Sequence, residues 1–435
     1  MNIIRLVAFS VIMALGGQAA ASAIYLTNTT PEPIQIDVHH YGSRTLTEGS
    51  QWQQFVTEIP PYATRKVLEF NRFWGVSRGH TYNFDTYVTQ GNSTVVLQQS
   101  MTGTWTGSRI VHSARGDDFD APWFNGWEIN RFATDYAGNA SLVGVKPHAT
   151  LEYADFRYVV HNHTLPEQVS GTDELKVVTY NVEDLWVNAS KRAARMAAIP
   201  SHMQGYDVIL MQEAFSGLRD EMLLEFAAEY PYQTHIPSGN SWNLFDSGTV
   251  ILSRYPISRV ADFVYPDCTG TDCFADKSVV YAEVIKNGKA YHVTNTHAAS
   301  FDTDSARAVR QIQFQQIRAL VDEQDIPVWE PVMMGGDFNV NKLIFPDDHA
   351  QMLANLDATE PTNTGHGSTY DGSVNANIGS GKVQYLDYVV YSNTHLAPTA
   401  SRNDVRVPRS ANDDLWNWWD LSDHFPVMGE FSFAP

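Results

Sequence analysis

The sequence is poor in the features that several classes of protein require. Its 435 residues include only two cysteines, Cys268 and Cys273, and no block of basic residues. Asp and Glu number 49 against 29 Lys and Arg, so the formal net charge is -20. Because phosphate contacts come from clustered Lys and Arg, this charge argues against a protein held to nucleic acid by its own positive field. Two cysteines alone rarely hold zinc.

Long apolar runs are also absent, apart from one near the start of the chain. Residues 1–23 have the pattern of a secretory signal peptide, with Arg5, an apolar stretch over 6–15 and a small-residue cleavage pattern at Ala21-Ser22-Ala23. That stretch is too short to span a bilayer. We therefore expect an exported, soluble protein, extracellular or periplasmic. Oxidising conditions favour a disulfide between the two cysteines over two free thiols or a metal site.

Composition divides the remaining chain into two parts, although one large domain is the alternative. Residues 24–163 are rich in Thr, Tyr, Trp and Asn, with short β-branched runs between Gly-containing turns, which predicts a small β-sandwich. Its exposed aromatic residues could bind sugar or lipid, but core packing is the simpler explanation, and its partner is unknown. Residues 164–173 are typical of a linker. Residues 174–435 alternate strands and helices, which predicts a layered α/β domain.

The expected elements of the second part follow from its apolar patterns. Strands are expected at 175–180, 207–211, 248–253, 278–286, 290–296, 332–334, 385–391 and 425–433, and helices at 190–203, 217–229 and 305–322. A hairpin around Asn287-Gly288 indicates a mixed sheet instead of a purely parallel one.

Polar side chains recur where these strands begin or end. They are Asn181, Glu213, His297, Asp337, Asn339, Asp387, Asp423 and His424. Loops at strand ends are where α/β sheets place ligand sites. Each residue alone has a structural explanation as a turn, a cap or a satisfied polar group. Their recurrence at successive strand ends favours one common site.

The stretch Gly335-Gly336-Asp337-Phe338-Asn339 is central to this site. Two glycines let the backbone bend and approach a ligand closely. Asp337 and Asn339 are two residues apart, so in extended backbone their side chains would point to the same side. A simple turn is the alternative explanation for the stretch taken alone.

The residue types indicate metal-assisted chemistry at the site. Asn181, Glu213 and Asp423 offer hard oxygen ligands, which suit Mg²⁺. A zinc site is less favoured, because the chain has no thiols to spare for it. An ion held by few protein ligands can neutralise a phosphoryl group and its leaving oxygen.

Two histidines complete the expected chemistry. His424 can take a proton from water while Asp387 holds its imidazole in the right tautomer. His297 can hydrogen-bond a phosphoryl oxygen or assist the leaving group. No Ser, Thr or Cys occupies an obvious nucleophile elbow, so direct attack by water is preferred over a covalent intermediate.

Several motifs resemble those of the endonuclease/exonuclease/phosphatase superfamily, which has the DNase I-like fold. They are Tyr180-Asn181-Val182, Leu210-Met211-Gln212-Glu213, Thr296-His297, Gly336-Asp337-Phe338-Asn339, Leu386-Asp387-Tyr388 and Ser422-Asp423-His424-Phe425-Pro426-Val427. The resemblance covers about residues 175–433 and implies a four-layer α/β sandwich with two mixed β-sheets.

The same resemblance implies a role for each site residue. Asn181, Glu213 and Asp423 would surround a divalent ion. Asp337 and Asn339 would orient water and the phosphoryl group. Asp387 would support His424, and His297 would be the second essential histidine.

Within that superfamily the sequence is most similar to the bacterial neutral sphingomyelinases C, and it lacks the Pro-Ala-Trp-Cys-Asp-Arg signature of inositol polyphosphate 5-phosphatases. The similar pieces are Gln212-Glu213-Ala214-Phe215, Ala275-Asp276-Lys277-Ser278-Val279-Val280-Tyr281, Asp337-Phe338-Asn339-Val340-Asn341-Lys342, Thr364-Gly365-His366 and Thr369-Tyr370-Asp371. That branch commonly has Gly where Ser278 stands. The resemblance implies a Mg²⁺-dependent enzyme, with Mn²⁺ or Co²⁺ as substitutes, that hydrolyses sphingomyelin to ceramide and phosphocholine.

An aromatic cluster next to the last motif fits a membrane substrate. Trp416, Trp418 and Trp419 could lie at a membrane interface, where a ring with a polar N–H is favoured, and Phe215 is a further candidate. Core packing is the alternative for each. The negative net charge suits a zwitterionic choline headgroup better than anionic lipid or DNA. The rival functions are an exported nuclease and a catalytically silent lipid-binding or adhesin module.

Overall fold

The computed structural model describes residues 21–126, 128, 130–136, 139–149, 154–162, 167–185, 191–215, 217–239, 245–379, 381–410, 412–415 and 418–434. The chain forms two compact units, residues 1–163 and 164–435. Strand β1 begins at Ala21, so the predicted cleavage pattern overlaps the first strand. In the part of the chain that the structure describes, no helix has both the length and the apolar character needed to cross a bilayer.

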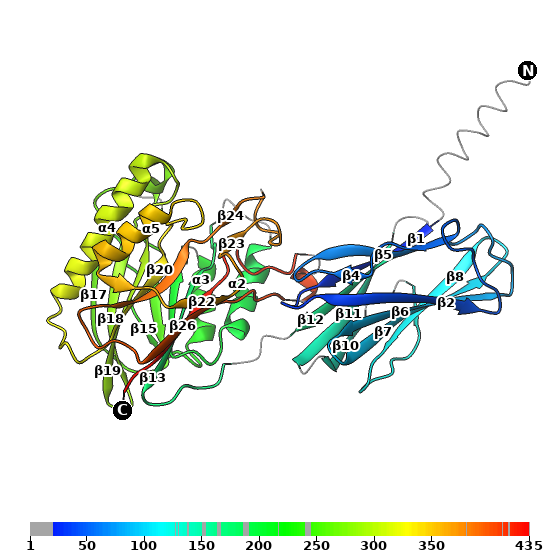
Figure 1. The fold of residues 1–435 in the computed structure, drawn as a ribbon, viewed down its shortest axis with the longest axis horizontal. Coiled ribbons are helices and arrows are strands. Elements are labelled where there is room, and N and C mark those ends of the chain that lie inside the picture. The colour runs from blue at the N-terminus through cyan, green and yellow to red at the C-terminus, as the bar shows by residue number, and fades with distance from the viewer. Residues whose placement is uncertain are drawn as a thin grey trace, which may run out of the picture. The chain divides into compact units, whose positions relative to one another are not determined.

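The first unit consists of two six-stranded sheets (Figure 1). One sheet has the order β10 (Asn130–Tyr136), β11 (Asn139–Ala149), β12 (Ala154–Asn162), β1 (Ala21–Asn28), β5 (Thr64–Asn71) and β3 (Trp52–Gln54). The other has the order β4 (Glu58–Ile59), β2 (Ile34–Gly42), β6 (Thr81–Gln90), β7 (Ser93–Gly103), β8 (Ser108–Arg115) and β9 (Phe124–Asn125).

Both sheets of the first unit contribute to one hydrophobic core. Leu26, Phe70 and Phe156 from the first sheet pack with Phe84 and Leu97 from the second. The rings of Phe70 and Phe84 stack at 4.5 Å between centroids. Alternating buried and exposed residues along β2 have the period of two that a half-buried strand requires. The unit is the strand-rich sandwich that the sequence predicts.

The described part of the second unit contains two mixed sheets, of seven and six strands, and a short hairpin. The first sheet has the order β15 (Tyr232–Gln233), β16 (Val250–Ser253), β14 (Val208–Gln212), β13 (Glu174–Asn181), β27 (Val427–Ser432), β26 (Ala400–Val405) and β22 (Thr362–Gly365). The second has the order β17 (Ile257–Val264), β18 (Ser278–Lys286), β19 (Lys289–His297), β20 (Val332–Asp337), β25 (Asp387–Ser392) and β21 (Ala358–Thr359). The hairpin pairs β23 (Tyr370–Asp371) with β24 (Val383–Gln384).

Helices cover the outer faces of the two sheets (Figure 1). They are α2 (Arg192–His202), α3 (Gly217–Phe226), α4 (Asp304–Asp322) and α5 (Pro346–Leu356), with short 3₁₀ turns η1 (Gly270–Phe274) and η2 (Asp413–Leu415). Helices α2 and α3 pack on the first sheet, and α4 and α5 pack on the second. A separate cluster that includes Leu210, Ile251, Val293 and Met333 fills the space between the sheets. This order of layers confirms the expected four-layer α/β sandwich.

Candidate active site

The register of neighbouring strands brings the predicted residues together. His297 at the end of β19 pairs with Asp337 at the end of β20, and Asp337 pairs with Asp387 at the start of β25. Glu213 directly follows β14, whose last residue pairs with Asn181 of β13. The ends of both sheets therefore meet on one edge of the sandwich.

The two glycines before Asp337 are required by close packing around the strand. A Cβ on Gly335 would lie 2.6 Å from a methyl carbon of Leu210 in the facing sheet. Gly336 has a φ of +148°, and a Cβ there would lie 2.0 Å from the carbonyl oxygen of Thr296 in the neighbouring strand. Any larger residue at either position would push Leu210 or the backbone of Thr296 aside. Only glycines therefore let β20 pack closely enough to place Asp337 at the junction of the two sheets.

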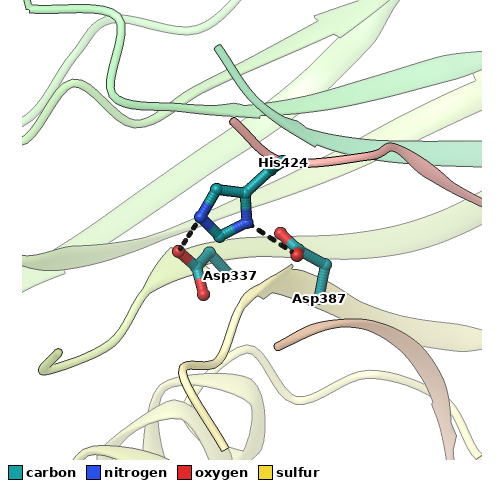
Figure 2. A group of neighbouring side chains, drawn as sticks. All are labelled: Asp337, Asp387 and His424. Atoms are coloured by element: carbon teal, nitrogen blue, oxygen red, sulfur yellow. Dashed lines mark hydrogen bonds and ion pairs between the residues drawn. The ribbon is translucent and has the colours of Figure 1, made fainter. Parts of the chain in front are cut away.

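Asp387 and His424 form a hydrogen-bonded pair beside Asp337 (Figure 2). Nδ1 of His424 lies 2.8 Å from Oδ2 of Asp387, and Nε2 lies 3.8 Å from Oδ2 of Asp337. The three residues are each at most 6% exposed. Because a carboxylate only accepts, Nδ1 carries the proton, which leaves Nε2 directed toward Asp337 and suited to accept a proton.

A second group of oxygen atoms lies around the amide of Asn181. Its Nδ2 donates to Oε1 of Glu213 at 3.0 Å and to Oδ2 of Asp337 at 3.1 Å. Its Oδ1 instead accepts from the backbone N–H of Glu183 at 3.1 Å. Asn181 thus holds two carboxylates together. For its predicted role as an oxygen ligand, the side-chain amide must flip so that Oδ1 takes the place of Nδ2.

Burial and like charge shift the pKa values of the acidic groups. Burial, followed by the charge of Asp423, raises the pKa of Glu213 to about 7. Burial raises the pKa of Asp337 to about 6. The charge of His424 acts to lower this pKa, and the charge of Asp387 acts to raise it. Burial alone would lower the pKa of His424, but the surrounding carboxylates raise it well above its ordinary value. Negative charge is therefore in excess at this edge.

The donor set fits a hard divalent cation. Buried carboxylate oxygens with an excess of negative charge are the ligands that Mg²⁺ prefers. Oδ1 of Asp387 has no hydrogen-bond partner among the described residues, so the site contains a buried oxygen with unused acceptor capacity. Ligand atoms of Asp337, Asp387 and His424 lie within 4.8 Å of one another, which is a different trio from the predicted Asn181, Glu213 and Asp423.

His297 lies next to Lys277, a residue to which the sequence motifs assign no role. Nζ of Lys277 lies 2.6 Å from Nε2 of His297, and both side chains are buried. Because an ammonium group only donates, Nε2 accepts and the proton is on Nδ1. Burial, then the charges of Lys277 and His424, lower the pKa of His297 well below its ordinary value. The ring is therefore neutral, and Lys277 places a positive charge beside it.

Comparison with known proteins identifies the relatives of this site. A model of the Endonuclease/Exonuclease/phosphatase family matches residues 178–424, which is more than half of the chain. The chain belongs to this family. Every predicted site residue between Asn181 and His424 lies inside the match, whereas the first unit lies outside it.

The similar proteins within the family are bacterial. Sphingomyelinase C of Bacillus cereus is 30% identical over 303 residues, which are 60% of this chain and 91% of the relative. Phospholipase C of Staphylococcus aureus is 31% identical over 318 residues, covering 65% of this chain and 96% of the relative. These relatives support a phosphodiesterase.

Solved structures of family members agree with the fold. Sphingomyelinase C from Streptomyces griseocarneus is 31% identical, covers 60% of this chain and 99% of its own, and has a TM-score of 0.54. A variant of beta toxin from Staphylococcus aureus, solved with bound magnesium ions, is also 31% identical, with the same coverage and a TM-score of 0.55. A DNase I-like arrangement is therefore established for the second unit.

One local expectation about this family motif is wrong. Strand β20 ends at Asp337, and Asn339 has a φ of +54°, so the two residues do not share an extended backbone. Oδ1 of Asp337 accepts the backbone N–H of Asn339 at 3.0 Å, and the Asn339 amide donates to the carbonyl of Ala298 at 3.1 Å. Asn339 therefore ties the loop after β20 to the loop after His297.

The aromatic candidates for membrane contact differ from expectation. Trp419 is only 6% exposed, so the prediction that its ring contacts lipid is wrong. Trp418 is half-buried and donates its indole N–H to Oδ1 of Asn377 at 2.6 Å. Trp416 lies outside the described residues. Phe215 is half-buried and packs 5.4 Å from the ring of Phe245.

Two further residues support the site. The buried hydroxyl of Thr369 accepts the backbone N–H of Leu386 at 2.8 Å and that of Asp387 at 3.2 Å, which fixes the start of β25. The disulfide between Cys268 and Cys273 closes the loop that holds η1. In that loop, Oδ2 of Asp272 accepts the backbone N–H of Ser300 at 2.5 Å, which ties it to the segment after His297.

Proposed function

We propose that the protein is an exported, divalent-cation-dependent phosphodiesterase that hydrolyses sphingomyelin to ceramide and phosphocholine. The observation that carries the proposal is the Asp387–His424 pair facing Asp337 beside the partly buried Asn181–Glu213 contact. The sphingomyelinase C relatives support the choice of substrate. The disulfide between Cys268 and Cys273 supports an oxidising compartment.

The proposed reaction is a direct displacement by water. Nε2 of His424 takes a proton from a water molecule held between it and Asp337, while Asp387 stabilises the imidazolium that forms. The water oxygen forms a bond to phosphorus as the bond to the ceramide oxygen breaks. The ceramide oxygen takes up a proton from solvent and His424 releases the proton it took from water to solvent, so phosphocholine and ceramide are the products and His424 is regenerated.

Glu213 and Asp423 would hold the cation, with Asn181 if its amide turns, and Asp337 would orient the attacking water. When bound, the cation would stabilise charge on the phosphoryl oxygens and offset the negative charge that raises the pKa of His424. Lys277 and the neutral ring of His297 add a donor and a positive charge at the same edge.

Exposed apolar side chains on loops beside the site support a lipid substrate. Phe301, four residues after His297, is 50% exposed. Leu343 and Ile344, in the loop after β20, are 50% and 61% exposed, and Phe274 of η1 is 57% exposed. The loop that carries Phe274 is joined to the one that carries Phe301 by the Asp272–Ser300 hydrogen bond. Apolar residues at a site entrance favour a membrane interface.

The test is release of phosphocholine from sphingomyelin vesicles by purified protein with Mg²⁺. We expect release that EDTA abolishes, that Mg²⁺ in excess restores, and that is lost in His424→Ala. Plasmid DNA and phosphatidylcholine vesicles serve as competing substrates. Release that persists in EDTA, or faster cleavage of DNA than of sphingomyelin, would reject the proposal.

A further inference from the structure

Three loops of the first unit form one continuous surface at an end of the sandwich. They are residues 43–51, 72–80 and 104–107, between β2 and β3, β5 and β6, and β7 and β8. Nη1 of Arg44 donates to Oγ of Ser77 at 2.8 Å, which joins the first loop to the second. The backbone N–H of Gly79 donates to the carbonyl of Gly103 at 3.0 Å, and Gly103 directly precedes the third loop, so this bond joins the second loop to the start of the third. We call these three segments the loop surface.

The loop surface carries three exposed aromatic side chains, and one of them, Trp105, is the most exposed aromatic residue in the described part of the chain. Trp105 is 81% exposed, Trp74 is 66% exposed and Phe73 is 38% exposed. Gly107 lies directly under the ring of Phe73, because a Cβ there would be 2.5 Å from a ring carbon. Large aromatic rings held in solvent by ordered loops indicate an interaction site.

Positive charge gathers on the same loops in an otherwise acidic chain. Arg44, Arg72, Arg78 and Arg109 lie in or directly beside the loop surface, and Glu48 is the one acidic residue there. The chain as a whole has a net charge of -20. The guanidinium carbon of Arg78 lies 3.8 Å from the centroid of Trp105, so charge and ring are presented together. Tryptophan beside arginine is typical of protein segments at a lipid–water interface, where the ring lies among headgroups and the cation near phosphates.

The polar side chains around the rings argue against a sugar ligand. Oδ1 of Asn71 accepts the backbone N–H groups of Phe73 and Trp74 at 2.9 and 2.8 Å. The amide of Gln51 accepts from Thr47 at 2.8 Å and donates to the carbonyl of Trp74 at 3.2 Å. The Gln51 amide and Oδ1 of Asn71 hold the loop in shape, so these atoms are not available for the hydroxyl groups that a sugar site must bind.

We propose that the loop surface docks the first unit onto the interface of a phospholipid bilayer. Trp74 and Trp105 would insert among the headgroups, and the neighbouring arginines would bind lipid phosphates. The sandwich would then keep the enzyme on its substrate-bearing surface between turnovers. Docking itself requires no sphingomyelin and no catalysis, so it stands independently of the proposed function.

The test compares the full chain with Trp74→Ala/Trp105→Ala and with Trp123→Ala. Trp123 is 51% exposed in the same unit but outside the loop surface, which makes it a matched control. Binding is measured by flotation with sphingomyelin-free vesicles of phosphatidylcholine, with and without phosphatidylserine. We expect the double variant to bind about tenfold or more weakly, because two interfacial rings are lost, and the control to bind like wild type.

Hydrolysis of the soluble ester p-nitrophenylphosphocholine separates docking from catalysis. We expect the double variant to cleave it at the wild-type rate. Arg78→Gln should bind phosphatidylserine vesicles with a weaker dependence on salt concentration than wild type. Absence of vesicle binding by wild type, or equal binding by wild type and the double variant, would overturn the proposal. Loss of binding to immobilised polysaccharide in the double variant, with vesicle binding intact, would also overturn it and assign the surface to sugars.

Discussion

Asp387 and His424 are 37 residues apart in the chain, yet Nδ1 of His424 lies 2.8 Å from Oδ2 of Asp387. The contact arises because Asp387 begins β25 next to β20, while His424 precedes β27 of the other sheet. The pair thus spans both sheets of the second unit. Its geometry depends on the packing of the whole domain, so the pairing is predicted by the motifs taken together and not by the local sequence around either residue.

Asp387→Asn should remove most of the catalytic rate while leaving the fold intact. An amide cannot stabilise the imidazolium and favours the wrong tautomer of His424, so kcat should fall by about 10²- to 10⁴-fold. The measurement is phosphocholine release at saturating Mg²⁺, with thermal unfolding as the check of folding. Asp325→Asn, at an exposed position after α4, is the matched control. A variant that retains more than a tenth of the wild-type kcat would contradict the pairing.

Glu213→Gln should weaken cation binding more than it affects stability. The substitution removes a carboxylate that is in contact with Asn181 and close to Asp337. Loss of one ligand should raise the Mg²⁺ concentration needed for half-maximal activity by at least about 10- to 100-fold. Calorimetric titration with Mg²⁺ gives a readout without substrate. The exposed Glu323→Gln at the end of α4 should titrate like wild type, and equal affinities for Glu213→Gln and wild type would remove Glu213 from the ligand set.

Lys277→Met should lower kcat through loss of a buried donor beside His297. The 2.6 Å contact positions the neutral ring and supplies positive charge, so we expect a fall of about 10²-fold with a smaller change in KM. Lys289→Met, at the opposite end of the β19 strand, is the control. Partial recovery in Lys277→Arg would support an electrostatic role, whereas unchanged activity in Lys277→Met would exclude one.

The position of Lys277 shows what sequence reasoning could have found. The turn at Asn287-Gly288 pairs Lys286 with Lys289 and Val279 with Thr296. Continuing that register places Lys277 beside the residues at the end of β19. The motif around Lys277 alone indicates no role for it, whereas the hairpin register places it beside the end of β19.

Sequence patterns predict some elements of the second unit and not others. The strand at 278–286 and the helix near 305–322 were predicted because their apolar periodicity is strong. Helix α5 was missed because only Met352 and Leu356 are buried along it. Trp419 lies in the core with a φ of +64°, a backbone state that no local pattern of apolar residues indicates. Strand ends could be predicted, but side-chain directions in the loops that follow them depend on tertiary contacts.

Cys268→Ser/Cys273→Ser should reduce activity more than stability. The bridge closes a short loop, so its effect on the unfolded chain is about 2 kcal/mol in a loop-entropy estimate. In the folded state the same loop positions Asp272, which accepts the backbone N–H of Ser300. Oδ1 of Asp272 also lies 3.8 Å from Nζ of Lys277. We therefore expect a several-fold fall in kcat, reproduced by treating wild type with dithiothreitol. The serine variant should not respond to the reductant, and full wild-type activity in that variant would show that the loop keeps its position without the bridge.

Glu360→Gln should remove a pH-dependent part of the stability of the second unit. Burial alone would raise the pKa of Glu360, but contacts from His349, Lys342 and Asn363 lower it to about 2. A carboxylate whose pKa is lower in the folded state stabilises that state above the unfolded pKa, and the stabilisation is lost as the pH falls through the folded pKa. The stabilisation should therefore be complete near pH 7 and decline between about pH 5 and 2.

The expected size of this effect follows from the shift. A change from 4.5 to about 2 corresponds to about 3 kcal/mol at neutral pH, and the side chain is only 10% exposed, so solvent screening is weak. Denaturant unfolding of wild type, Glu360→Gln and the exposed control Glu323→Gln at pH 7 and pH 3 measures it. The difference between Glu360→Gln and wild type should shrink at pH 3, because wild type loses part of the same stabilisation on approaching the folded pKa. A difference of equal size at both pH values would mean that Glu360 stabilises the fold by packing and not by its charge.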